Sequence, residues 1–304
     1  MSNKHEVYAS AAGIIVVACI ISVFSIFYAK NGKALLPMSA KLRNTIEIPL
    51  SQADSLKADY DSKNLEVYVW QEDKIVIKEY LTSGSNDAKA TVDFDGNKAI
   101  VTGGKSEWSL GNLFWGDGNQ RIEIYLPASG INELELATGS GNIRTKGKFA
   151  IEIQRADIHT GSGNITWENT TAQDIAFNAN SGNIRIDNIK GDTQLHTGSG
   201  NITVEELRGS CMAEAGSGNI KVSAAEITGD VTLETGSGNQ RLELPDKLSF
   251  SLEVHTGSGN IHTDYDEVLS YNNKGDIATA KVGDNPICRI NLQAGSGNVT
   301  LRKR

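Results

Sequence analysis

Eight asparagines recur in this chain, each as the last residue of Ser-Gly-Asn, and their side chains are the first candidates for chemistry. Glycine-rich turns that carry aspartates bind calcium in other repeat proteins, because carboxylates supply the charge that the ion needs. Here every copy holds Asn and none holds Asp, so we predict no metal site. We predict instead a structural corner ladder, in which stacked asparagines hydrogen-bond from layer to layer. Its members are Asn142, Asn164, Asn183, Asn201, Asn219, Asn239, Asn260 and Asn298.

Three histidines, His159, His196 and His255, occupy one column of the repeat and raise the question of a metal stripe. His159 and His196 are two repeats apart, with Asn178 between them. Layers about 4.8 Å apart would place these two rings roughly 10 Å from each other. That separation is too large for one ion held by bonds of about 2 Å. We therefore interpret the column as a polar surface.

Two groups of carboxylates could serve a glycan-active enzyme, since such enzymes work with paired Asp or Glu side chains. One group is Asp264, Asp266 and Glu267, and the other is Glu205 and Glu206. Both fall where a loop would leave a regular stack, so we expect solvated acidic loops. The sequence contains no nucleophile–base arrangement, phosphate-binding loop or dinucleotide motif. We predict no catalytic residue and no cofactor.

The elements that position these residues repeat with a period of about 20 residues. Successive Ser-Gly-Asn serines are spaced by 22, 19, 18, 18, 20, 21 and 38 residues, and we interpret the last spacing as two periods. Lys274–Ile277 would then be a weakened copy that fills the gap. A fixed period of this length indicates one structural unit stacked many times.

Within each unit, apolar and polar residues alternate on both sides of the corner. Leu195 and Thr197 flank His196 before one corner, and Ile202 and Val204 flank Thr203 after it. A period of two is typical of half-buried strands, and Gly and Asn tolerate the backbone angles of a tight corner. The sequence therefore predicts an all-β fold, a parallel β-solenoid of repeats of about 19–20 residues.

Composition limits the partners and the bonds that hold the chain together. The net charge is −8 and the isoelectric point is near 5.2, which disfavours nucleic acid as a partner. The three cysteines are Cys19, Cys211 and Cys288. Their spacing fits no zinc motif, and although a Cys211–Cys288 disulfide is feasible, separate thiols are the simpler expectation.

Residues 7–29 form an apolar run of 23 residues without a charge. At about 1.5 Å per residue this run is long enough to cross a bilayer as a helix. We predict one transmembrane helix that acts as a single-pass anchor. Two alternatives are a cleaved signal peptide and a lipoprotein in which Cys19 is lipidated. The charges that flank the run favour a cytoplasmic repeat domain by the positive-inside rule.

These patterns divide the chain into five parts. Residues 1–6 form an N-terminal tail, 7–29 the transmembrane helix and 30–44 a linker. Residues 45–127 form an irregular first part of the solenoid, and residues 128–304 its regular Ser-Gly-Asn part. A larger repeat joins the two: Gly-Asn-Gln-Arg followed by an apolar–Glu strand occurs at 118–127 and again at 238–245.

The strand ending in Leu126–Pro127 and the serial Ser-Gly-Asn-Ile repeats resemble the bacterial DUF4097 domain family, which is related to the DUF2807 head domains of adhesins. The resemblance covers about residues 45–304. One N-terminal helix followed by such a domain is similar to the LiaG type of envelope-stress protein. The family implies a β-solenoid at the cell envelope, and it favours a repeat domain outside the cytoplasmic membrane over the orientation that the flanking charges suggest.

We expect a non-enzymatic, membrane-anchored envelope protein, either an adhesin or an envelope-stress-associated binding or scaffold module. Its partners would be the membrane and an envelope protein or wall polymer. One alternative is a glycan-active β-helix enzyme. The other is a self-assembling scaffold of the bactofilin type, whose units would associate end to end.

Overall fold

The computed structural model describes residues 39–105, 119–147, 149–265 and 268–304, and the chain divides into two compact units. One unit, residues 1–39 and 108–119, lies almost entirely outside these ranges. The other, residues 40–107 and 120–304, holds the described strands and a short 3₁₀ helix at Asn86–Ala88. Within the described ranges, no helix has the length and apolar character needed to cross a membrane. The predicted span at 7–29 is outside them.

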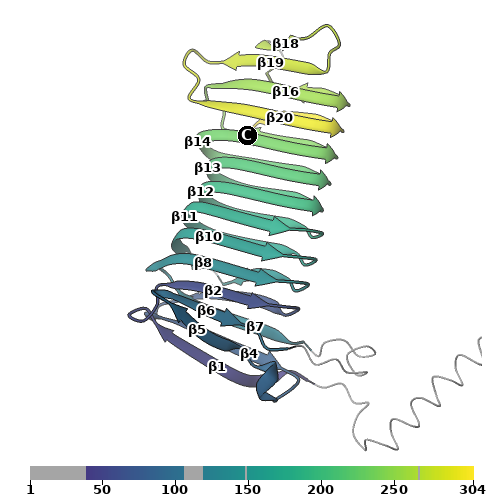
Figure 1. Cartoon of the computed structure of the whole chain (residues 1–304). Helices are drawn as coiled ribbons and strands as arrows, with labels where there is room; N and C mark the ends of the chain where they lie inside the picture. The colour runs from purple at the N-terminus through teal and green to yellow at the C-terminus, as the bar shows by residue number, and fades with distance from the viewer. Residues whose placement is uncertain (1–38, 106–118, 148, 266–267) are drawn as a thin grey trace, which may run out of the picture. The chain divides into compact units, whose positions relative to one another are not determined.

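The repeats form rungs of a stack, and each rung has one strand before the Ser-Gly-Asn corner and one after it (Figure 1). We name the strands before the corner face A. In spatial order face A begins with β5 (Thr91–Asp95), β6 (Lys98–Thr102), β2 (Ser55–Tyr60), β8 (Ile131–Thr138) and β10 (Ile151–Thr160). The later parts of four long strands follow, β11 (Ile165–Ala179), β12 (Ile184–Ser199), β13 (Ile202–Ser217) and β14 (Ile220–Ser237). Face A ends with β20 (Cys288–Ser296), β16 (Phe250–Ser258), β19 (Ile277–Val282) and β18 (Ser270–Tyr271).

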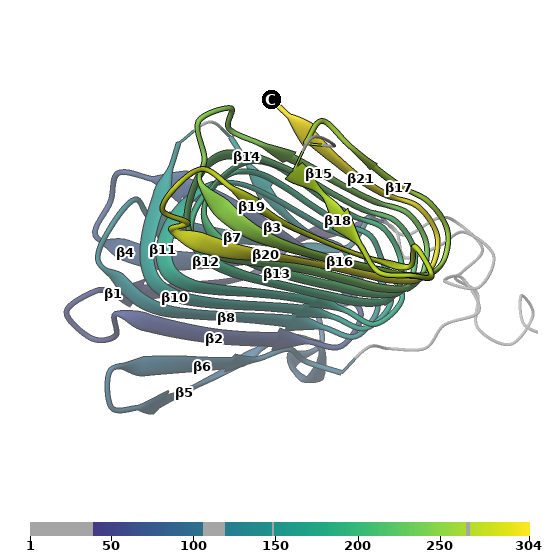
Figure 2. The same ribbon diagram turned by 90° about the horizontal axis from the view of Figure 1, so that it is seen from above.

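Face B holds the strands that follow the corner. In spatial order it contains β1 (Lys41–Pro49), β4 (Lys74–Leu81), β7 (Arg121–Pro127), β3 (Asn64–Trp70), β9 (Ile143–Lys146), the first parts of β11 (Ile165–Ala179), β12 (Ile184–Ser199), β13 (Ile202–Ser217) and β14 (Ile220–Ser237), then β15 (Gln240–Leu244), β21 (Val299–Lys303) and β17 (Ile261–Thr263). Rung-to-rung pairing is parallel on both faces. Figure 2, which looks along the stack, shows the rungs as superimposed loops around one interior.

The four longest strands turn from face B of one rung to face A of the next. Asn169, Asn188 and Glu206 make this bend with φ of 56°, 51° and 54°. This left-handed region is tolerated by Asn better than by most side chains. The bend therefore lets one continuous strand line two sides of the core.

The core is built from columns of equivalent residues. Five of them come directly after the corner asparagine and are at most 1% exposed: Ile143, Ile165, Ile184, Ile202 and Ile220. Their outward neighbours, such as Thr203, are polar. Burial in the described rungs thus follows the predicted alternation, and the all-β prediction is confirmed.

The order of the last rungs differs from the order in the sequence. β20 pairs in parallel with β14 on one edge and with β16 on the other, and β21 likewise lies between β15 and β17. The Ser296 repeat therefore sits inside the stack, between the Ser237 and Ser258 repeats (Figure 1). The expected rung at Lys274–Ile277 is wrong. This segment makes a turn at Gly275 (φ 75°) and leads into β19, which pairs antiparallel with β16.

The first rungs show the same rearrangement. The β2–β3 rung lies between the β6–β7 rung and the β8–β9 rung, although it precedes both in the chain. Outside it, β5 pairs antiparallel with β6, and β4 and β1 add two antiparallel strands beyond β7. The register of β3 shows that Ser62–Val67 is a degenerate copy of the Ser-Gly-Asn-Ile repeat.

Candidate functional site

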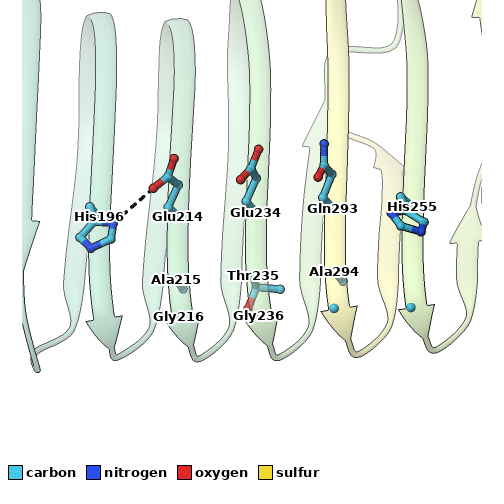
Figure 3. A pocket seen from close by; sticks show the side chains of 12 residues that line it. His196, Glu214, Ala215, Gly216, Glu234, Thr235, Gly236, His255, Gln293 and Ala294 are labelled. Atoms are coloured by element: carbon cyan, nitrogen blue, oxygen red, sulfur yellow. Dashed lines mark hydrogen bonds and ion pairs between the residues drawn. The ribbon is translucent and has the colours of Figure 1, made fainter.

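A shallow groove of about 430 Å³ crosses the outer surface of face A (Figure 3). The side chains that border it belong to one outward-facing column of the repeat. In each rung this residue stands two positions before the first glycine of the corner. Strand register places them side by side in the order His196, Glu214, Glu234, Gln293 and His255. The groove thus spans five consecutive rungs, including the inserted one.

Glycines form the floor of the groove. Gly216, Gly236, Gly295 and Gly257 follow one another in neighbouring rungs, and a Cβ added to Gly236 would lie 2.6 Å from the carbonyl oxygen of Gly216. No side chain fits there, because Cβ atoms do not approach other atoms so closely. The floor is therefore bare backbone, and the column of His, Glu and Gln side chains rises beside it.

The side chains of this column have donors and acceptors that are not used in hydrogen bonds between them. His196 Nδ1 lies 3.3 Å from Glu214 Oε2, and Gln293 Nε2 donates to Asn291 Oδ1 at 3.3 Å. Glu234 lies in register with Glu214, and its carboxylate has no hydrogen bond or ion pair among the described residues. Like charges on facing strand positions destabilise a sheet. A ligand that offers donors would relieve this pair.

The groove does not have the environment that acid–base catalysis requires. A catalytic general acid among carboxylates needs a raised pKa, which burial in an apolar pocket provides. The Glu214 side chain is 45% exposed, and the Glu234 side chain is also partly open to solvent. Within the described ranges, no three His, Cys, Asp or Glu side chains converge in a way that could hold a metal ion. The groove therefore presents exposed hydrogen-bonding side chains beside a bare backbone floor.

A second surface cluster lies on face B, near the first rungs, and sequence reasoning missed it. Tyr68 and Tyr125 stack with ring centroids 5.0 Å apart and planes at 16°, and Trp70 packs on Tyr125 at 5.3 Å. Lys78 lies 4.6 Å from the centroid of Tyr125, and the Arg121 guanidinium lies 3.9 Å from that of Tyr80. The only sequence signal was that these aromatics fall on alternate strand positions.

Two carboxylates below these rings complete the cluster. The Glu66 and Glu123 side chains are only 9% exposed, and Arg144 and Arg121 pair with them at 2.8 Å and 2.9 Å. The Tyr68 hydroxyl donates to Glu66 at 3.1 Å. Burial, followed by the nearby Glu66 charge, raises the pKa of Tyr68 to about 12. Because each charge and ring face already has a partner, we interpret the cluster as a brace for the first rungs.

The asparagines form a continuous chain of hydrogen bonds along the corner. The backbone N–H and side-chain Nδ2 of Asn201 both donate to Asn183 Oδ1, at 2.9 Å and 3.2 Å. Asn64, in the degenerate repeat, accepts from Asn142 in the same way. The side chains therefore connect nine rungs, in the order Asn64, Asn142, Asn164, Asn183, Asn201, Asn219, Asn239, Asn298 and Asn260.

Where the small residue before a corner is Thr, its hydroxyl bonds to backbone groups of the corners. Thr160 Oγ1 donates to the Gly141 carbonyl of the preceding rung at 2.9 Å and accepts from its own corner at Gly163 N, 3.1 Å away. Thr197 donates to Gly182 in the same manner at 2.8 Å. These buried hydroxyls satisfy backbone groups that the turn leaves without strand partners.

The described members of the two acidic groups noted in the sequence form ion pairs with arginines. Asp264 pairs with Arg302 and accepts from Lys303 N at 3.0 Å, contacts that hold its pKa below the usual range. Glu206 pairs with Arg208 and Arg304. Asp266 and Glu267 lie outside the described residues. The cysteines Cys211 and Cys288 are free and buried, and Cys19 also lies outside the described ranges.

One family model matches the chain. It is Toastrack DUF4097, and the match covers residues 43–302, which includes every strand of the stack except the first two residues of β1 and the last residue of β21. No curated protein matches the chain at a significant level.

The chain is similar to several solved structures. The chain is similar to a putative adhesin from Bacteroides fragilis, at 16% identity and a TM-score of 0.51, over 88% of this chain and 100% of that one. It is also similar to a protein from Parabacteroides distasonis described as a putative lipid binding protein, at 17% identity and a TM-score of 0.47, over 84% and 96% of the two chains. At these identities the likeness concerns the fold.

Proposed function

The chain belongs to the Toastrack DUF4097 family, and from this premise we propose that it is a non-enzymatic, membrane-anchored protein of the bacterial cell envelope. Its face A groove would bind an extended envelope polymer, a glycan strand rich in hydroxyl or ammonium donors. The stack would act as a rigid support that presents this groove at a fixed place.

The observation that carries this proposal is the contrast between the groove and the aromatic cluster. In the cluster each carboxylate is paired with a cation. In the groove the Glu234 carboxylate has no such partner among the described residues, and its neighbours are acceptors or neutral groups. The column offers polar side chains at the rung spacing of about 4.8 Å, so a chain with regularly spaced donors can meet several of them at once.

The envelope location rests on the sequence. Residues 7–29 supply the apolar span, and 11 residues separate it from β1 at Lys41. We propose that the span is an uncleaved anchor and that the stack lies outside the cytoplasmic membrane. Protease added to intact protoplasts should then digest the domain. A domain that stays whole until lysis would place it in the cytoplasm.

The structure of the ends favours this binding role over an end-to-end scaffold. Both ends of face A carry antiparallel strands, and the outermost of these, β18, is only two residues long. Short or irregular edge strands discourage pairing with another chain. A filament built by simple end-to-end stacking would instead require open, regular parallel edges.

Binding of envelope glycans to the full-length protein tests the proposal. Glu234→Gln removes one of the two carboxylates of the groove with little change in volume, and we expect it to weaken glycan binding about tenfold, measured by calorimetry. Glu253→Gln is the matched control, because Glu253 lies on the same face but does not line the groove. Equal affinity of both variants and the unchanged protein would refute the groove as the site.

A further inference from the structure

The β20–β21 rung lies between two rungs that both precede it in the chain. β20 hydrogen-bonds to β14 through residues 231–237 and to β16 through residues 250–258. Its inward residues Cys288, Ile290, Leu292 and Ala294 are at most 6% exposed, as are Val299 and Leu301 of β21. Without residues 288–304, β14 and β16 would face each other across the width of one missing strand.

We call this gap between β14–β15 and β16–β17 the slot. Two strand spacings of about 4.8 Å separate its walls. Side chains alone cannot fill that width, and both walls would expose unpaired backbone groups, which readily recruit another strand. The slot therefore requires a strand with apolar residues at alternate positions.

The inserted rung is held by the common corner bonds and by one further side chain, Gln240. Asn298 N donates to Asn239 Oδ1 at 2.9 Å, and Asn260 N donates to Asn298 Oδ1 at 3.0 Å. Gln240 stands where most rungs have Ile, and its buried Nε2 donates to the Gln293 carbonyl of β20 at 2.6 Å. The slot thus recognises residues 288–304 by side chains as well as by strand pairing.

The inserted rung is connected to the preceding rungs only through residues 283–287, whatever follows Arg304. All five of these residues are exposed, among them Pro286 and Ile287, and the Ile287 side chain is 68% exposed despite its apolar character. The corner contacts of the rung join residues 38 and 59 apart, Asn298 with Asn260 and with Asn239, whereas the regular corners join residues 18 to 22 apart. Contacts of larger sequence separation form later, so we expect the slot to be open while the regular rungs form.

From these observations we propose that β20–β21 is an exchangeable rung, and that the slot accepts residues 288–304 of a second copy of this chain. The exchanged pair has the same strand pairing and the same corner bonds as the closed monomer. Only the 283–287 connection changes its path, and such swaps of identical elements form dimers at low energetic cost. This inference does not depend on the ligand proposed for the groove.

Two cysteine variants of the full chain test the exchange, and both retain the buried thiols Cys211 and Cys288. Thr232 of β14 and Asn291 of β20 are partners in register on the outer surface, so cysteines at both positions lie within disulfide reach. Thr232→Cys and Asn291→Cys chains, both with Cys19→Ser, are unfolded, mixed, refolded together and oxidised. We expect a disulfide-linked dimer that contains one chain of each variant.

Two control experiments are needed to interpret the result. A single chain with both substitutions should form the same disulfide, within one chain in the closed monomer and between chains in the exchanged dimer, which shows that the two positions are within reach. A mixture of Thr232→Cys with Glu253→Cys should form no interchain bond, because these residues are separated by β20 and neither belongs to the exchanged rung. Internal closure of the double variant without any mixed dimer would overturn the proposal.

The length of the connection provides a second measurement. Deleting Asp284 and Asn285 shortens the path from β19 to β20, so the strand reaches its own slot less easily than that of a second copy. We expect the dimer fraction after refolding to rise severalfold, measured by light scattering. An unchanged monomer after deletion would also count against exchange.

Discussion

The two ends of the stack are closed by different arrangements of strands and side chains. At each end an inserted rung separates the outermost rung from the regular stack, β2–β3 at the first end and β20–β21 at the last. The first end is closed on both faces, by β5 on face A and by β4 and β1 on face B. The last end is closed on face A only, by β19 and β18, while face B finishes at the three-residue β17.

The side chains of the two ends also differ. The first end carries buried carboxylates paired with arginines beneath stacked aromatic rings. In the chain, its inserted rung follows β1 and precedes β4, two strands that close the same end. The inserted rung of the last end is connected to the preceding rungs through the exposed residues 283–287. Local stability depends on buried contacts and protected hydrogen bonds, so the last end should open first.

The largest effect should come from a charge in the core of an inserted rung. Leu65→Asp and Leu301→Asp place a carboxylate at positions that are 0% and 1% exposed. Burying it costs several kcal/mol. We expect Leu65→Asp to unfold the chain in one transition at lower denaturant, and Leu301→Asp to remove protection from 240–304 alone, as measured by hydrogen exchange. Loss of protection along the whole stack in both variants would abolish the distinction between the ends.

A smaller effect should separate two copies of one motif. Arg121–Glu123 and Arg241–Glu243 occupy equivalent positions, but the Glu123 side chain is 9% exposed and the Glu243 side chain 20%. Glu123→Gln breaks a buried network and should cost about 3 kcal/mol in unfolding free energy. Glu243→Gln should cost about 1 kcal/mol or less. Equal costs in denaturant titrations would indicate that the first end has no special brace.

The same pair predicts a pH dependence. The hydrogen bond that Arg241 donates to Glu243, together with the positive charge of Arg241, holds the pKa of Glu243 below the ordinary carboxyl value. A lowered folded-state pKa stabilises the fold above the ordinary value, and this contribution is lost as pH falls through the lowered pKa. Glu243→Gln should therefore flatten the acid limb of the stability curve, and an unchanged acid limb would contradict the assignment.

Thiol labelling should detect the opening of the last end directly. Cys288 begins β20, whereas Cys211 lies in the middle of the stack, where burial raises its pKa to about 12. Under native conditions at pH 8 we expect Cys288 to react at least about tenfold faster, a difference of about 1.4 kcal/mol in opening free energy. Peptide mass spectrometry assigns the labels. Equal rates would mean that the inserted rung opens no more readily than its neighbours.

The smallest effect, none, is expected from metal removal. The asparagine corners lack carboxylates, and the described residues of neither end contain a group that could hold an ion. Chelator should leave the melting temperature of the full chain unchanged. A fall in melting temperature that calcium reverses would require a metal site at one of the corners.

The alternation of inward and outward residues, the corners and the degenerate repeat at Ser62–Val67 were all predictable from the sequence. The position of β20 was not, because its inward pattern is equivalent to that of every other rung and pairs equally well with either neighbour. The spacing of 38 residues fitted two periods, and only Gln240 in an Ile column hinted at a different neighbour. The groove also depended on this order, since Gln293 enters the column between Glu234 and His255.

The face B cluster illustrates another limit. Glu66 and Glu123 look like ordinary outward residues in a strand pattern, and the sequence does not indicate that Arg144 and Arg121 cover them. Their burial arises because three strands from distant parts of the chain, β3, β7 and β9, lie side by side. Pairing across such separations is a property of the fold and leaves no local signal.

The corner glycines restrict how a chain of this kind can change length during evolution. A Cβ on Gly163 would lie 1.8 Å from the Gly141 carbonyl oxygen, and one on Gly182 would lie 1.6 Å from that of Gly163. An insertion within the corner would move a side chain into this column, whereas duplication of a complete unit preserves every contact. The corners should therefore keep their length among descendants, while unit spacings of 18 to 22 residues show that the segments between the corners accept small insertions. Each gained or lost whole unit changes the height of the stack by about 4.8 Å.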